Sequence, residues 1–125
     1  MMERVRGVGG VFFKARDPEM LAAWYRDHLG VPVAAGQTYA AFESTGPGDQ
    51  TVWSTFPAQT EYFGPGSSGL MVNYRVDDLD AMLAQLRNAG VEVVERVEEY
   101  DYGRFGWAVD PEGNRFELWE PKSPS

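Results

Sequence analysis

The chain lacks cysteine and has a single histidine among its 125 residues. The absence of cysteine excludes disulfides, thiolate nucleophiles and zinc–sulfur sites together. The one histidine, His28, falls in the last turn of a predicted helix, where a polar or cationic ring favours the negative end of the helix dipole. We therefore interpret His28 as structural and look for function among carboxylates, amides and aromatic side chains.

Long hydrophobic runs are also missing. No segment approaches the roughly 20 apolar residues of a membrane span. The first ten residues, MMERVRGVGG, carry a weak positive charge without the apolar run of a signal peptide. We predict a cytoplasmic protein with no membrane partner.

Positive charge is scarce, because 11 basic residues stand against 19 acidic ones and the formal net charge is −8. A nucleic-acid partner needs a basic footprint, so none is expected. The ordinary interpretation of such a charge is solubility, and the alternative is attraction of a cationic ligand. Hydrophobic residues make up 43% of the chain, enough for one globular domain spanning residues 1–125.

Turn and cap residues divide the first half into short elements. Asp17 is a predicted N-cap, Pro18 suits the first helical position, and Gly30 is a predicted C-cap. Trp24 and Tyr25 lie on the apolar stripe of that helix and are predicted core residues. Four strands are predicted in this half: Val8–Ala15, Val31–Ala35, Tyr39–Glu43 and Thr51–Phe56. Thr45–Gln50 and Pro57–Ser68 are predicted connections.

The second half repeats this order. A strand at Leu70–Val76 precedes a helix capped at Asp77-Asp78 and ended by Gly90, and a further strand is predicted at Val91–Val97. Asp17 and Asp77 are 60 residues apart, as are Gly30 and Gly90. This repeated spacing of helix-cap residues indicates two βαβββ modules, at about residues 8–57 and 70–121.

The last part of the chain reads as strand, tight turn, strand. Gly106–Val109 is a short apolar run, and Asp110-Pro111-Glu112-Gly113 has the residues of a turn. Arg115–Glu120 then alternates, so Phe116 and Leu118 should point to one face of the sheet. Glu117 should point to the other.

Three segments resemble those of the vicinal oxygen chelate superfamily, the glyoxalase/bleomycin resistance/dioxygenase proteins. The first segment is Arg16-Asp17 leading through Ala23-Trp24-Tyr25 to Leu29-Gly30. The second is Val76-Asp77-Asp78-Leu79-Asp80 leading to Ala89-Gly90-Val91, and the third is Asp110–Leu118, DPEGNRFEL. The resemblance spans nearly the whole chain and implies an α+β fold of two βαβββ modules whose curled mixed sheets form a cup. It also implies a homodimer.

The same resemblance places metal ligands on several cup-facing strands of metal-binding members. Glu117 matches the acidic ligand on the last strand. The other positions carry over to Gly10, to Met71, and to Trp53 or Ser54. Transition-metal sites need several His, Cys or carboxylate donors that converge, so the sequence predicts no metal and no cofactor.

Candidate site residues are one acid and a set of aromatic and polar residues. Glu117 is the candidate catalytic residue, as a general base whose pKa burial would raise, although it could equally be a structural carboxylate paired with arginine or a hydroxyl. Trp53 and Trp107 are assigned equally to a pocket and to the core. Arg104 could bind an anionic group or pair with Glu117 or Asp101, and Tyr100–Phe105 could form a flap. The predicted ligand-binding residues are Trp53, Tyr62, Met71, Asn73, Tyr102, Arg104 and Trp107.

Three functions remain open from the sequence. The first is metal-free binding of a hydrophobic or aromatic small molecule, with sequestration of a cationic planar drug as its specific form. The second is a lyase, isomerase or dioxygenase-like enzyme that uses Glu117 as acid/base or metal ligand. The third is an interaction module with an empty cup, which large residues filling the cup would favour.

Overall fold

The computed structural model describes residues 2–42, 50–65 and 69–122. The chain forms two compact units, which we call unit 1 (Met1–Gly9 with Val72–Ser125) and unit 2 (Gly10–Met71). Strands β1 (Val5–Ala15) and β4 (Leu70–Val76) each contribute residues to both units. These units cut across the repeat, so the single domain with two modules stays a prediction.

Unit 2 is built from α1 and three strands. α1 (Pro18–Leu29) begins after Asp17, whose side chain accepts a hydrogen bond from the Met20 backbone N–H, and ends at Gly30 with φ +73°. The strand order is β2 (Tyr39–Phe42), β3 (Thr51–Pro57), β1. β3 runs parallel to β1 and antiparallel to β2. The predicted strands and helix are therefore present here, apart from one.

That exception is Val31–Ala35, which forms no strand. Pro32 has no N–H to give to a ladder, and the chain turns there so that the Val33 N–H bonds to the Val31 carbonyl at 2.7 Å. Val31 and Val33 are nevertheless buried, with Ala22 and Ala40, in the core between α1 and the strands. The apolar alternation reflected burial rather than strand pairing.

The first helix also contains a wrong prediction. Tyr25 packs against this core as expected, but Trp24 is 50% exposed. Helical spacing placed both rings on one stripe, whereas consecutive residues are about 100° apart around the helix, so only one can face the sheet directly. Trp24 instead contacts Tyr25 and His28 on its own helix.

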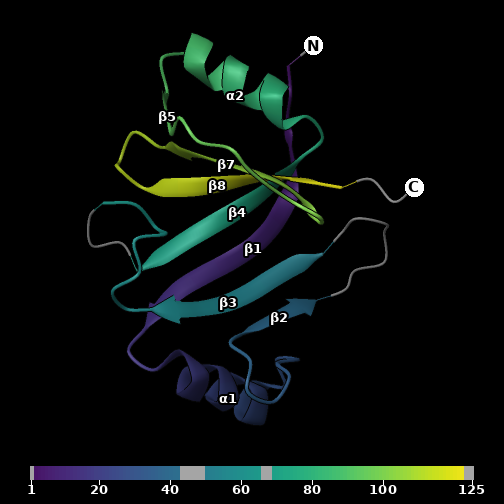
Figure 1. Ribbon diagram of the computed structural model, residues 1–125, viewed down its shortest axis with the longest axis vertical. Coiled ribbons are helices and arrows are strands. Elements are labelled where there is room, and N and C mark those ends of the chain that lie inside the picture. Colours follow the sequence, from purple (N-terminus) through teal and green to yellow (C-terminus); the bar gives the residue numbers. More distant parts are fainter. Residues whose placement is uncertain (1, 43–49, 66–68, 123–125) are drawn as a thin grey trace. The chain divides into compact units, whose positions relative to one another are not determined.

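Unit 1 contains the remaining elements. Its strands are ordered β1, β4, β8 (Arg115–Pro121), β7 (Gly103–Val109) and β5 (Glu92–Val93), and β6 (Glu98–Tyr100) also pairs with β7. β4 and β8 are parallel, whereas β7 is antiparallel to β8, β5 and β6. The helix of this unit is α2 (Leu79–Asn88). In Figure 1, α2 lies next to β7 and β8, and it contacts both strands.

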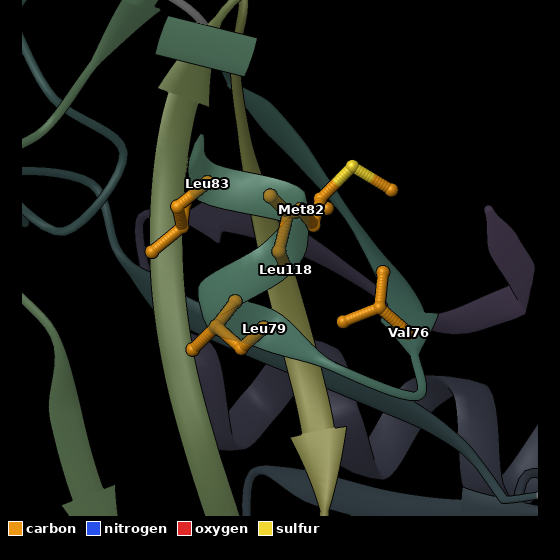
Figure 2. Close-up of a cluster of buried hydrophobic side chains, with 5 residues drawn as sticks. All are labelled: Val76, Leu79, Met82, Leu83 and Leu118. Carbon is orange, nitrogen blue, oxygen red and sulfur yellow. The ribbon is translucent and has the colours of Figure 1, made fainter. Parts of the chain in front are cut away.

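The core of unit 1 lies between α2 and the sheet. Figure 2 shows Leu79, Met82 and Leu83 of the helix gathered with Val76 of β4 and Leu118 of β8. All five are at most 5% exposed. Phe116 also packs against this cluster, so the predicted face of β8 that carries Phe116 and Leu118 is confirmed.

Two boundaries in unit 1 differ from the sequence predictions. Val91–Val97 is a strand only at Glu92–Val93, and the chain re-enters the sheet as β6. Tyr100–Phe105 is not a flap loop, because β6 and β7 form a tight hairpin in which Tyr100 pairs with Gly103. The fold class is nevertheless α+β, as predicted, with one helix covering one sheet face in each unit. Within the described residues, neither helix is both long and apolar enough to cross a membrane.

The turn between β7 and β8 forms at Asp110, as predicted. One carboxylate oxygen of Asp110 accepts hydrogen bonds from the backbone N–H groups of Glu112 and Asn114, both at 2.9 Å. The other oxygen accepts from the Asn114 amide at 3.1 Å. The backbone hydrogen bond from Asn114 makes the largest contribution to lowering the pKa of Asp110 below its ordinary value.

A lowered pKa in the folded state gives a pH-dependent contribution to stability. We expect Asp110→Ala to destabilise the protein at pH 7, where the carboxylate is charged in both states. The difference from wild type should shrink as pH falls through the folded-state pKa, because the acceptor is then protonated. Urea unfolding at pH 7 and near pH 2.5 would measure this. Equal differences at the two pH values would contradict it.

Candidate functional site

The candidate site lies on the sheet face of unit 1 opposite α2, which we call the Glu117 face. Val76 and Leu118 point to α2, so alternation directs their strand neighbours to the opposite face. The register then sets Asn73 beside Glu117 across β4 and β8, and Trp107 beside Glu117 across β7 and β8. This face therefore brings together the catalytic candidate and two predicted ligand-binding residues.

Glu117 is 1% exposed and is held by two neutral donors. Its Oε1 accepts a hydrogen bond from Asn73 Nδ2 at 2.6 Å, and its Oε2 accepts one from Trp107 Nε1 at 2.8 Å. A buried carboxylate held in one orientation by flanking strands is positioned to accept a proton or a hydrogen bond.

Asn73 is also 1% exposed, and its side-chain oxygen Oδ1 is directed at Gly9 of β1. Asn73 Oδ1 has no hydrogen-bond partner within the described structure, and it lies against the α-carbon of Gly9. A side chain at position 9 would collide with this atom and with the Trp119 ring. Gly9 therefore allows Asn73 to reach Glu117, a role that the sequence reasoning did not assign to it.

Trp107 is fully buried, and two guanidinium groups lie over its ring. The Arg96 guanidinium carbon is 4.8 Å from the ring centroid, and that of Arg115 is 5.5 Å away. Both distances are in the range of cation–π contacts. Sequence reasoning missed both arginines as site residues. Alternation in β8 could have identified Arg115, because it is two residues from Glu117, but no local signal marks Arg96.

The β6–β7 hairpin carries an aromatic group next to this face. Phe105 stacks on Trp119 with centroids 5.8 Å apart, confirming that Phe105 and Trp107 share a strand face. Tyr102 is 61% exposed and stacks on Tyr100. Glu98 accepts a short hydrogen bond from the Tyr100 hydroxyl, and this bond raises the pKa of Tyr100. Tyr102 is thus at the exposed tip of the hairpin rather than beside Glu117.

Arg104 lies on the other side of β7 from Trp107. Its Nη atoms bond to both carboxylate oxygens of Asp80 in α2, at 2.9 and 3.1 Å, and its Nε is 3.0 Å from Glu99. The hydrogen bond from Arg104 lowers the pKa of Asp80. The expected pairing of Arg104 with Glu117 or Asp101 is therefore wrong, because strand alternation directs it to the α2 side.

The remaining candidates belong to unit 2. Trp53 packs edge-on against Phe13 and at a tilt against Tyr25, and it is partly buried against the core on the α1 side of the sheet. Ser54, the next residue, points to the opposite side. Tyr62 stacks on Phe56 with centroids 5.3 Å apart, and Met71 is 1% exposed. Their role in ligand binding stays a prediction.

The residues of the Glu117 face do not fit a divalent metal ion. Both described partners of Glu117 use N–H groups, which repel a cation rather than coordinate it. Across residues 2–42, 50–65 and 69–122, no three His, Cys, Asp or Glu side chains converge as a metal site. The chemistry that these donors support is hydrogen bonding and proton transfer.

The comparisons define the class of protein. A family model for the glyoxalase-like domain matches residues 10–119, and the chain belongs to this family. Its fold is that of the glyoxalase/bleomycin resistance/dioxygenase superfamily, as the sequence predicted. Comparison with curated proteins gave no match.

Solved structures with the same fold include epimerases. A methylmalonyl-CoA epimerase from Mycobacterium tuberculosis is 26% identical, with a TM-score of 0.67, covering 95% of this chain and 90% of its own. A Streptomyces coelicolor methylmalonyl-CoA epimerase variant in complex with 2-nitronate-propionyl-CoA is 17% identical, with a TM-score of 0.72 and coverage of 93% and 97%. A superfamily member from Vibrio splendidus 12B01 is 15% identical, with a TM-score of 0.59 and coverage of 94% and 98%.

Proposed function

We propose that this protein binds a small organic molecule at the Glu117 face without using a metal ion. The observation that carries the proposal is the buried Glu117 carboxylate, held by Asn73 and Trp107 on the face of the sheet opposite α2. A buried charge is costly unless it is fully hydrogen-bonded, so such a group persists where it serves a ligand or a reaction. The aromatic rings nearby supply apolar contact area for an organic ligand.

The Trp107 indole N–H offers a direct probe of this site, because it donates to Glu117. We expect at least one compound from a panel of small organic acids, amides and amines to shift its NMR signal saturably in chelator-treated protein. The Trp53 indole signal should not move, since Trp53 packs on the α1 side of unit 2. If no compound shifts the Trp107 signal, or if the shift requires added metal, the proposal fails.

Glu117→Gln is the matched variant for this experiment. Its amide oxygen can still accept from Trp107, and its amide N–H can donate to Asn73 Oδ1 after rotation of the Asn73 amide, so the hydrogen bonds can be remade. We therefore expect a folded protein whose affinity for an amide or amine that donates to the carboxylate falls about tenfold, the typical effect of losing one hydrogen bond to a charged group. Binding of an anion should instead become tighter, because the variant removes a like charge. An unchanged affinity would place the ligand elsewhere.

A second candidate is an isomerase or lyase in which Glu117 is the general base. The likeness to the Mycobacterium tuberculosis epimerase at 26% identity favours this alternative. Incubation of methylmalonyl-CoA in D₂O would test it, since proton abstraction next to the thioester exchanges that hydrogen for deuterium. Exchange that Glu117→Gln removes would support a base role. Exchange that the variant leaves unchanged would assign the base elsewhere.

The homodimer and the cytoplasmic location remain predictions. Equilibrium sedimentation of the purified chain would measure its association.

A further inference from the structure

The surroundings of Trp107 are less acidic than the chain as a whole, because two arginines there stand beside the Glu117 and Glu98 carboxylates. The protein carries a net charge of −8, yet two guanidinium groups lie over one buried indole ring beside Glu117. Long-range attraction by the whole protein would favour a cation, but contacts at a few ångströms decide what binds. The local charge therefore has to be considered by itself.

Arg96 retains hydrogen-bonding capacity. Its Nε lies 3.0 Å from Glu98 Oε2, and its side chain is 54% exposed. Within the part of the chain that the structure describes, its two terminal nitrogens have no further ion-pair partner. The contact with Trp107 and the ion pair with Glu98 restrict the guanidinium, so these donors are partly pre-organised for an anion.

Arg115 adds a second guanidinium to the same ring. It is half-buried and comes from β8, two residues before Glu117, on the Glu117 face. Two guanidinium groups beside one aromatic ring suit a planar anion that can accept paired hydrogen bonds, of which the carboxylate is the simplest. The stacked Phe105 and Trp119 rings on the same face suit an apolar or aromatic body attached to it.

We infer that the ligand of the Glu117 face is an organic carboxylate with an apolar body, whose negative group is bound by Arg96 and Arg115. This inference rests on the proposed function and specifies the charge of its ligand. It replaces the cationic ligand that the net charge of the chain suggests.

Three compounds of nearly the same size and shape test which ligand charge the site prefers. Benzoate is an anion, benzamide is neutral and benzamidine is a cation, and all three have the same ring. Each would be titrated into chelator-treated protein while the Trp107 indole N–H signal is followed. We expect benzoate to saturate the shift at a concentration about tenfold lower than benzamide, because charged hydrogen bonds are roughly twice as strong as neutral ones. Benzamidine should bind more weakly than either.

Variants of Arg96 and Arg115 test whether these two residues bind the negative group of the ligand. Arg96→Gln and Arg115→Gln should each weaken benzoate about tenfold and weaken benzamide by a smaller factor, because its hydrogen bonds to the arginines are weaker. Arg104→Gln is the matched control, since Arg104 bonds to Asp80 on the α2 side and should not alter benzoate binding. Glu98→Gln should tighten benzoate binding, because it removes the acid that shares Arg96.

The outcomes separate this inference from the proposed function. If benzamide or benzamidine binds at least as well as benzoate, the inference is wrong while the proposed function stands. If benzoate binds to Arg96→Gln and Arg115→Gln as tightly as to the wild-type protein, the inference is again wrong. If none of the three probes shifts the Trp107 signal, the inference fails, and the proposed function then depends on the broader panel.

Discussion

Leu118→Ala is expected to lower the free energy of unfolding by about 2–5 kcal/mol, the range for leucine-to-alanine changes in a core. Leu118 is 1% exposed and packs with Val76 of β4 and three residues of α2. Removing its branched end leaves a cavity between the helix and the sheet, because fixed strands cannot fully close the space. Since domains are stable by only about 5–15 kcal/mol, the effect would be a large fraction of the total.

Urea unfolding followed by circular dichroism would measure this loss, and a second leucine provides the control. Leu29 ends α1 and is 65% exposed, so Leu29→Ala should change the stability by no more than about 0.5 kcal/mol. A loss below about 1 kcal/mol for Leu118→Ala would mean that α2 does not pack on the sheet as described.

Gly9→Ala is expected to cost about 1–3 kcal/mol, the usual range for added volume in a packed interior. A β-carbon at this position would lie 2.9 Å from Trp119 Cε3 and 3.0 Å from Arg75 Cγ, and closer still to Asn73 Oδ1. The Asn73 amide must then move, which strains or breaks its hydrogen bond to Glu117. The variant should therefore shift the Trp107 indole signal as well as reduce stability.

Two comparisons isolate the cause. Gly69→Ala places a β-carbon that meets no heavy atom of the described residues within 4 Å, its chain neighbours aside, and its φ is not strained, so it should be nearly neutral. Combining Gly9→Ala with Asn73→Ala should cost less than the sum of the single changes, because the second removes the atom that the first displaces. Strict additivity would show that Asn73 is not the residue in contact.

Much of the fold follows from local patterns in the sequence. The caps at Asp17 and Asp78, the left-handed Gly30 and Gly90, and the Asp110 turn all form where cap and turn chemistry places them. Each depends on a few neighbouring residues, so the chain encodes it without reference to distant parts. The two faces of β8 likewise follow from alternation alone.

The partners within the site could not be predicted in this way. Glu117 and Asn73 are 44 positions apart, and only the parallel register of β4 and β8 sets them side by side. Arg104 was predicted to lie in a loop over the site and to bind an anion or pair with Glu117 or Asp101, yet strand alternation directs it to Asp80. Arg96 precedes β6 and carries no motif, so only the folded chain shows it over Trp107.

The sequence by itself determined the order of elements, their caps and the α+β class, because these depend on hydrophobic period and on residues within a few positions of one another. It also determined which side of β8 carries the acid. Only the tertiary structure decided that an amide and an indole hold that acid, and that two guanidinium groups lie over the indole. Strand register and the position of α2 set these neighbours, and both arise from packing between segments far apart in the chain.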